Sequence, residues 1–177
     1  GKRFTDEFGD RKTTTDAIFK VLDAGGKTIS VTDSVGVASF SKVRPGAMDI
    51  LRKNGAVKEY ATLDDLAKAY GISPDALKQT FAEFNKAIES GKDTEFGRKL
   101  DKDIKPLMHA PYYVSEMSPK IHHTMGGIAT DTSTRVLSVV DDKPIPGLYA
   151  AGECTGGIHG AVRIGANAVM DCLVNGK

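Results

Sequence analysis

The sequence predicts a protein in two parts: a charged, helical first part, then an α/β part in which a strand, a glycine-rich turn and a helix follow one another. Three observations predict this division. The composition changes near Pro111, from charged and helical to rich in Gly, Thr and short apolar runs. An amphipathic stripe runs along residues 74–90. A short apolar run at residues 148–151 leads into a glycine-rich stretch.

Local signals predict three helices before residue 110. A proline near the start and Gly55 as a stop predict a helix at residues 45–54. Thr62 is an N-cap residue followed by an apolar face, and it begins a second helix. The clearest helix occupies residues 73–91, where Ser-Pro begins it, Gly ends it, and apolar residues recur on one face. We interpret that face as directed at a core.

The second part predicts short strands and one helix. Residues 128–130 and 136–140 are expected to pair around a polar turn at residues 131–134. Residues 148–151 are expected to form a short buried strand, and residues 167–174 a helix. A strand, a glycine-rich turn and a helix in this order commonly build a phosphate or cofactor site.

Bulk properties exclude several classes of function. The chain has 177 residues, 27% of them charged, and a formal net charge of +1. That balance predicts no nucleic-acid partner. No apolar run is long enough to span a bilayer, so we expect no transmembrane segment. Because the chain opens on Gly1 rather than Met, we expect a mid-protein or processed end, and localisation stays open between cytoplasm and periplasm.

Cysteine usage is sparse. Cys154 and Cys172 are the only cysteines and form no C-x-x-C pair. This spacing excludes a zinc knuckle, a dithiol redox motif and a c-type haem attachment. We expect both residues to be thiols.

A histidine pair is the first group of residues that could take part in catalysis or binding. His122 and His123 precede Gly126 and Gly127. Adjacent side chains on an extended segment point to opposite sides, so the two histidines can serve different neighbours. The glycines allow a flat ligand to approach the backbone closely. The alternative is a structural pair, because a metal site would need further ligands at suitable spacings.

Two further segments carry charged residues. Residues 147–168 are glycine-rich and contain Glu153, which follows an apolar run and can accept hydrogen bonds from hydroxyls. They also contain Arg163, whose planar fork is suited to a carboxylate. The alternative is a turn-rich loop with surface charges. Residues 1–11 are charged, and the corresponding alternative is a solvated face.

Four sequence motifs together resemble one family. In chain order they are GKRF-x-x-E-x-x-x-R at residues 1–11, HHTMGG at 122–127, IPGLYAAGE at 145–153 and TGGIHGAVRIGANA at 155–168. They are similar to the soluble fumarate reductase and urocanate reductase flavoproteins, of flavocytochrome c type, within the succinate dehydrogenase and fumarate reductase superfamily. The resemblance implies that residues 1–110 are part of an α+β capping domain. Residues 111–177 would be the C-terminal α/β segment of an FAD-binding domain.

The resemblance also implies an activity. The chain would be the C-terminal portion of a bacterial FAD-dependent reductase. Hydride would pass from flavin N5 to the C=C bond of a small α,β-unsaturated carboxylate or dicarboxylate, such as fumarate or urocanate. Its partners would be an upstream FAD-binding half and an electron-donor domain or protein.

Individual roles follow from the matched positions. Arg11 occupies the position of the arginine that delivers a proton to the substrate. His122 and Arg163 occupy positions that hold the substrate carboxylate, and the backbone of Ala166 meets the substrate. The positions that contact FAD are His123, Glu153, Ala168 and Val169.

The sequence departs from the family at three points. Val162 stands where Asn is usual before the substrate arginine, Gly9-Asp10-Arg11-Lys12 stands where Thr-Thr-Arg-Asp is usual, and no G-x-G-x-x-G fingerprint occurs. The missing fingerprint favours an alternative, a non-catalytic binding module or a fragment that has lost its own flavin. A third possibility is a ketosteroid dehydrogenase, against which the pairing of His122 with Arg163 argues.

Overall fold

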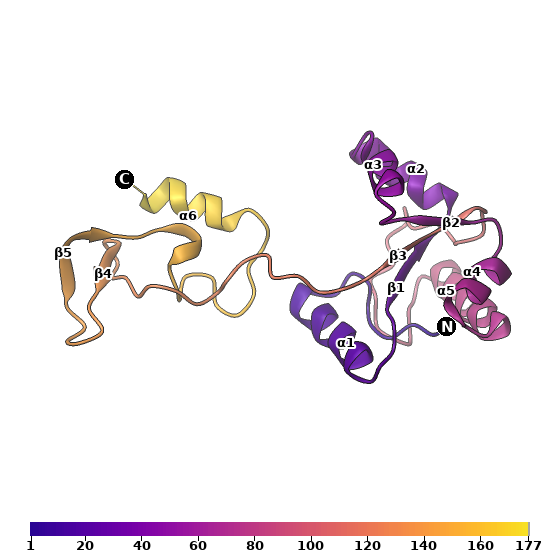
Figure 1. The fold of residues 1–177 in the computed structure, drawn as a ribbon, viewed down its shortest axis with the longest axis horizontal. Helices are drawn as coiled ribbons and strands as arrows, with labels where there is room; N and C mark the ends of the chain where they lie inside the picture. The colour runs from indigo at the N-terminus through magenta and orange to yellow at the C-terminus, as the bar shows by residue number, and fades with distance from the viewer. Residues whose placement is uncertain (177) are drawn as a thin grey trace. The chain divides into compact units, whose positions relative to one another are not determined.

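The computed structural model describes residues 1–176 as two compact units, Gly1–Pro119 and a second that begins at Lys120 (Figure 1). The observed division lies nine residues beyond the predicted boundary after residue 110. The reason is that a strand at Tyr112–Glu116 pairs with strands of the first unit. The identification of the units as capping-domain and FAD-domain portions stays a prediction.

The first unit combines helices with one antiparallel sheet. The sheet has the order β1-β3-β2, so its middle strand is the last in sequence. In this sheet Ile29 is paired with Glu116 and Lys58 with Val114. The elements in chain order are α1 (Arg11–Asp23), β1 (Ile29–Thr32), α2 (Ser34–Val43), α3 (Ala47–Lys53), β2 (Lys58–Tyr60), α4 (Leu63–Tyr70), α5 (Pro74–Ser90) and β3 (Tyr112–Glu116).

The middle strand β3 separates two packed faces. Tyr112 and Val114 lie on one face, since alternate strand residues share a side, and they join the core formed with α4 and α5. The Phe81 ring of α5 meets the Tyr112 ring edge-on at 5.7 Å. On the other face Arg52 of α3 donates a hydrogen bond of 2.9 Å to the Tyr113 hydroxyl. Buried apolar contacts therefore position the sheet within this unit.

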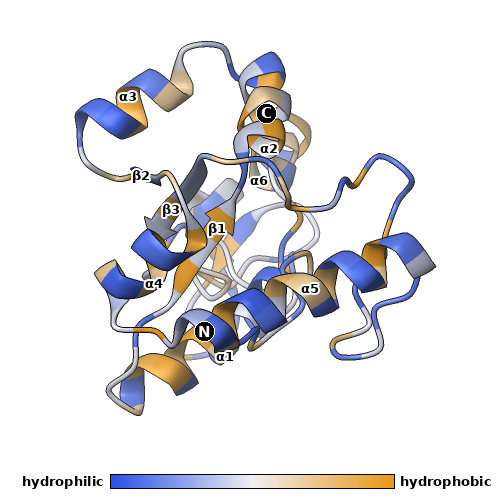
Figure 2. Cartoon of the chain, turned by 90° about the vertical axis from the view of Figure 1, so that its right-hand side faces the viewer, coloured by the Kyte–Doolittle hydropathy of each residue, from blue (hydrophilic) through white to orange (hydrophobic). Residues whose placement is uncertain are grey.

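The three helices predicted from capping signals are confirmed as α3, α4 and α5. The Thr62 hydroxyl accepts a hydrogen bond of 3.0 Å from the Asp65 amide, and Ser73 caps α5 in the same way. Gly91 ends α5 with a left-handed φ of 70°. Both hydrophilic and hydrophobic residues line α5, as its periodicity predicts (Figure 2).

Two further helices, α1 and α2, begin at aspartate caps that the sequence analysis did not identify. The Asp10 carboxylate accepts from the Thr13 amide at 3.0 Å. The Asp33 carboxylate accepts from the Gly36 amide at 2.9 Å and, across the fold, from the Met108 amide at 3.1 Å. Asp33 is 1% exposed, so this cap also ties a distant loop to the start of α2.

The second unit contains a hairpin, a short 3₁₀ helix and one α-helix: β4 (Arg135–Leu137), β5 (Pro144–Tyr149), η1 (Gly152–Cys154) and α6 (Asn167–Asn175). The predicted helix at residues 167–174 is confirmed. The expected pairing of residues 128–130 with 136–140 is confirmed only next to the turn, where Thr130 bridges Val136 and the Leu137 amide donates to the Ala129 carbonyl at 2.9 Å. Strand β4 pairs instead with β5. A turn closed by the Ser138 amide and the Lys143 carbonyl, at 2.8 Å, favours that hairpin.

The strand expected at residues 148–151 is confirmed only for residues 148 and 149, which end β5, and its expected burial is wrong. Leu148 is 47% exposed and Tyr149 is 62% exposed. Burial of a strand depends on a surface that covers it, and the apolar run alone does not specify one.

Some classes of site find no support in the described part of the chain. None of the helices in residues 1–176 has the length and apolar character needed to cross a membrane. Over the same residues, no cluster of three His, Cys, Asp or Glu side chains is arranged to hold a metal ion. Cys154 and Cys172 are free thiols, as predicted.

Truncating the core of the first unit tests its packing. Leu66 of α4 is fully buried, at 0% exposure. We expect Leu66→Ala to lower the free energy of unfolding by about 2–5 kcal/mol, because it removes buried methyl groups and leaves a void. Urea denaturation of the chain measures the change. The matched control Val43→Ala, at an 80% exposed position, should change it by less than about 0.5 kcal/mol; equal losses would contradict this assignment of the core.

Candidate functional site

The predicted site residues lie in both units, and each group is described within its own unit. Arg11 lies in the first unit, at the first position of α1. The second unit contains the residues predicted to bind substrate or cofactor, which are His122, His123, Glu153, Arg163, Ala166, Ala168 and Val169.

Arg11 is exposed and its guanidinium is free of ion pairs within the described residues. The two carboxylates closest to it in sequence are engaged elsewhere. Asp10 accepts from the Thr13 amide as the cap of α1. Glu7 pairs with Arg3 and Arg98. The charge of Arg11 is therefore available to a group that the chain does not itself supply.

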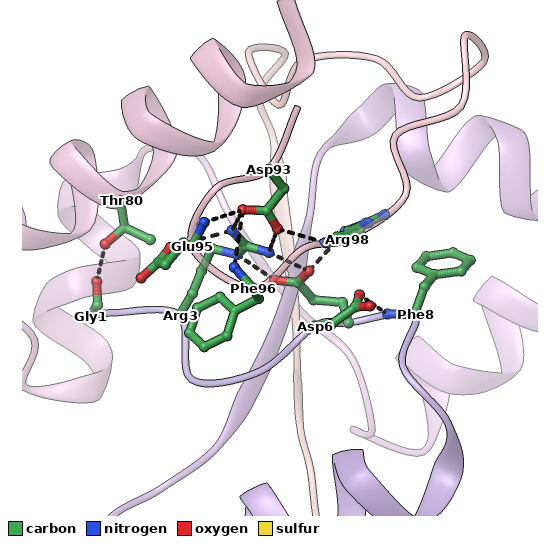
Figure 3. Close-up of polar contacts among 10 residues, drawn as sticks. Gly1, Arg3, Asp6, Phe8, Thr80, Asp93, Glu95, Phe96 and Arg98 are labelled. Carbon is green, nitrogen blue, oxygen red and sulfur yellow. Dashed lines mark hydrogen bonds and ion pairs between the residues drawn. The ribbon is translucent and has the colours of Figure 1, made fainter. Parts of the chain in front are cut away.

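An ion network centred on the largely buried Arg3 joins the segment before Arg11 to residues 93–98 (Figure 3). Arg3 Nε lies 2.7 Å from a Glu7 oxygen, and Arg3 Nη2 lies 2.8 Å from Asp93 Oδ2. The Arg3 side chain is only 9% exposed and stacks on the Phe84 and Phe96 rings, at 4.9 and 5.0 Å from their centroids. The alternative in which residues 1–11 form only a solvated face is therefore wrong for Arg3.

The carboxylates of this network have altered pKa values. The hydrogen bond from Arg3 holds the pKa of Asp93 well below its ordinary range, and the Glu95 and Phe96 amides lower it further against the opposing effect of burial. Burial raises the pKa of Glu7, but hydrogen bonds from Arg3 and Arg98 outweigh it, so the net shift is downward. Both carboxylates therefore stay ionised to a lower pH than they would in the unfolded chain.

In the second unit, two glycine segments lie against each other. The Ile128 amide donates to the Cys154 carbonyl at 2.8 Å, and the Gly156 amide donates to the Ile128 carbonyl at 3.1 Å. A methyl group at Gly127 would stand 2.4 Å from the Cys154 carbonyl oxygen, and one at Gly156 would stand 2.8 Å from the Gly127 amide nitrogen. Any side chain at either position would separate the segments.

Glu153 connects the glycine-rich turn to the histidine pair. One of its oxygens accepts from the Thr124 amide at 3.1 Å, and the other lies 3.4 Å from His123 Nδ1. The Glu153 side chain is 54% exposed, so its carboxylate keeps acceptor capacity for hydroxyl groups. Two of the residues predicted to contact FAD are thus brought together.

Three nitrogen atoms in this unit are buried without a partner in the described residues. They are His123 Nε2, His159 Nε2 and Arg163 Nε. The His123 and His159 rings pack edge-to-face at 5.7 Å. Arg163 is 8% exposed; its Nη1 donates to the Ile164 carbonyl at 3.1 Å, and it pairs with none of the carboxylates in residues 1–176. Buried polar groups without partners are costly and commonly mark a ligand site.

At the start of α6 the Ala168 amide has no partner in the described residues, whereas the Val169 amide donates to the Ala166 carbonyl at 2.9 Å. Ala166, its N-cap residue, adopts a left-handed φ of 69° and provides no side-chain cap. Ala168 and Val169 occupy the first turn, which contains no acidic residue. The amides and positive end of such a helix favour a negatively charged or acceptor-rich group. The buried Asp171 of α6 accepts from the Gly152 amide at 2.7 Å and fixes α6 to η1.

Two residues of this arrangement were missed by the sequence analysis. His159 lies within the TGGIHGAVRIGANA motif, and its position in this glycine-rich stretch was the signal available. Asp171 gave no signal, because a single acidic residue in a helix is ordinary. His122 is exposed, and no hydrogen bond or ion pair engages it in residues 1–176.

Comparison with known proteins gives consistent matches over the whole chain. The family model described as "FAD binding domain" matches residues 1–169. The acrylate reductase flavoprotein subunit of Shewanella woodyi is 35% identical over 99% of this chain and 34% of its own length. The urocanate reductase of Eggerthella lenta is 31% identical over 100% of this chain and 29% of its own. A solved open conformation of a flavocytochrome c3 fumarate reductase superposes with a TM-score of 0.72 at 39% identity, covering 99% of this chain and 29% of that one.

The ion network predicts how acid affects the first unit. Because the pKa of Asp93 is lowered on folding, its ionised form stabilises the unit above about pH 4, and that contribution is lost as the pH falls through the lowered pKa. We expect Asp93→Asn to cost about 1.5–3 kcal/mol at neutral pH, the usual contribution of a hydrogen bond to a charged group. Urea denaturation at several pH values should show the difference from the parent shrinking in acid. A difference independent of pH would contradict the assignment.

Proposed function

The chain belongs to the FAD binding domain family and is related to fumarate, acrylate and urocanate reductases, and on this premise we propose that it forms part of an FAD-dependent reductase of small unsaturated carboxylates. The chain spans only 29–34% of the length of the relatives compared above. The activity is therefore proposed for a larger flavoprotein that contains this chain.

The observation that carries the proposal is the uncompensated charge of Arg163. A buried guanidinium without a carboxylate partner is unfavourable unless a ligand supplies the negative charge. A substrate carboxylate would do so through paired hydrogen bonds, the geometry for which Arg is suited. His122, exposed and free of partners in the described residues, would hold the same group.

The residues of the second unit also fit FAD. Methyl groups at Gly126 or Gly157 would meet no atom within 4 Å, so the glycine segments leave room for a flat ring. The unpartnered His123 nitrogen and the exposed Glu153 carboxylate can bond to acceptor and hydroxyl groups of the cofactor. The Ala168 amide, in the first turn of α6, would offer a backbone donor, and Val169 would contact the cofactor from the same turn. Once reduced by its electron donor, the bound flavin would supply the hydride for reduction of the C=C bond and would return to its oxidised form.

The chain's own residues then have distinct tasks. Arg163 and His122 would orient the alkene and stabilise negative charge that develops as one alkene carbon receives the hydride. Arg11 would deliver a proton to the other carbon, which completes the balance of the reduction. A guanidinium in water has a pKa above about 12, so proton delivery by Arg requires a site that favours its neutral form transiently.

Removing the buried charge of Arg163 tests the substrate role. In the full-length flavoprotein we expect Arg163→Met to raise KM and lower kcat, for a combined loss of roughly 2–5 kcal/mol in kcat/KM. In the ligand-free chain the same change should leave stability unchanged or raise it, because an unpaired buried charge is removed. Steady-state kinetics and urea denaturation measure the two effects.

A matched control is Arg135→Met, because Arg135 is half exposed and pairs with Asp131. It should leave the kinetics unchanged. If Arg163→Met destabilises the ligand-free chain and leaves the kinetics near normal, Arg163 is structural and the proposal fails.

The role of Arg11 is tested at the step that needs a proton. We expect Arg11→Ala to preserve substrate binding while substrate-dependent oxidation of the pre-reduced flavin slows by about 10²–10⁴-fold, the usual contribution of general acid catalysis. Stopped-flow absorbance isolates this step. Lys12→Ala, which changes the next exposed cation on α1, is the control and should react at the parent rate. An unaltered rate in Arg11→Ala would remove the proton-delivery role.

A further inference from the structure

Helix α1, which begins at Arg11, is loosely packed against the rest of its unit along much of its length. Ile18 is the one buried residue of α1. A cavity of about 600 Å³ lies beside it, lined by Thr14 and Ile18 of α1, Ile29 and Val31 of β1, and Phe81 of α5. A helix next to a cavity forfeits packing contacts on that side. Its placement therefore depends strongly on how its ends are attached.

The end that carries Arg11 is attached without a freely rotating segment. The Phe8 amide donates to Asp6 Oδ1 at 2.8 Å, and the Gly9 amide donates to the Asp6 carbonyl at 3.2 Å, which forms a tight turn. The next residue, Asp10, caps α1 through the Thr13 amide. The position of residue 7 is thus transmitted to Arg11 through a turn and a cap.

Residue 7 is itself fixed by two guanidiniums. One oxygen of Glu7 accepts from Arg3 Nε at 2.7 Å, and the other accepts from Arg3 Nη2 at 2.9 Å and from Arg98 Nη1 at 3.1 Å. The side chains of Arg3 and Arg98 are 9% and 10% exposed, and both guanidiniums lie over the Phe84 ring. Such charge-assisted, bidentate contacts restrict direction as well as distance.

We propose that Glu7, held between Arg3 and Arg98, is a positioning residue that fixes the start of α1 and thereby the guanidinium of Arg11. The proposal rests on the proposed function of Arg11 as the proton donor. Glu7 is assigned no contact with substrate or cofactor. Its carboxylate acts only through the placement of Arg11.

Hydrogen exchange tests the positioning independently of activity. In Glu7→Gln, which keeps the size of the side chain, we expect the Thr13 and Thr14 amides to exchange about tenfold faster, which corresponds to ~1.4 kcal/mol. Amides in the middle of α5 should be unaffected. Asp16→Asn is the matched control, because it removes an exposed ion pair with Lys12 on the same helix, and it should change neither group. Unaltered exchange at Thr13 and Thr14, or an equal increase in α5, would overturn the proposal.

Kinetics of the full-length flavoprotein then separate the proton-donor role of Arg11 from the positioning role of Glu7. Glu7→Gln should lower kcat roughly 10- to 100-fold with KM preserved, as expected of a misplaced catalytic group. Added to Arg11→Ala, it should cause no further loss, because Glu7 acts through Arg11. Additive losses would overturn the positioning role. If Arg11→Ala alone reacts at the parent rate, the proposed function of Arg11 has failed, and the exchange data still decide whether Glu7 fixes the helix.

Discussion

A carboxylate shared by two buried guanidiniums joins the start of the chain to the loop that follows α5. Glu7 lies between Arg3 and Arg98, and Arg3 also holds Asp93, ninety residues away in sequence. Without these contacts the first ten residues would have few apolar side chains to hold them. The network therefore decides where α1 begins, while the apolar core around α4, α5 and β3 decides where it can lie.

The second unit is organised by a different constraint, the close approach of backbone segments. Gly127 and Gly156 allow two segments to share hydrogen bonds at a distance that no side chain would permit. The interior there is mostly polar, because Thr155, Arg163 and Asp171 are buried, and Val136 is the large apolar residue that it buries in the described part. Such an interior is stabilised by matched hydrogen bonds more than by hydrophobic burial, so each unmatched group in it is informative.

These two constraints explain what could be predicted from the sequence. The caps Thr62 and Ser73 act over three or four residues, so α4 and α5 were predictable from local pattern. The sheet was not, because β3 pairs with strands about fifty and eighty residues earlier and no periodicity encodes that order. In the candidate site the motifs identified Arg163 and His123 as residues of interest. Their burial and missing partners became visible only in three dimensions, since both depend on the fold of the glycine segments.

The contrast between the two charged regions separates structural charge from functional charge. In the first unit Arg3 meets carboxylates on several sides and Arg98 meets Glu7, so each guanidinium charge there has a carboxylate of the chain beside it, although Arg98 Nε has no hydrogen-bond partner in the described residues. In the second unit Arg163 is buried about as deeply as Arg3, yet it forms no ion pair with a carboxylate in residues 1–176. Desolvation costs both regions alike, and only the second lacks an internal compensation. A bound anion would supply that compensation, which supports the proposal that the substrate carboxylate binds at Arg163 rather than at the more strongly charged start of the chain.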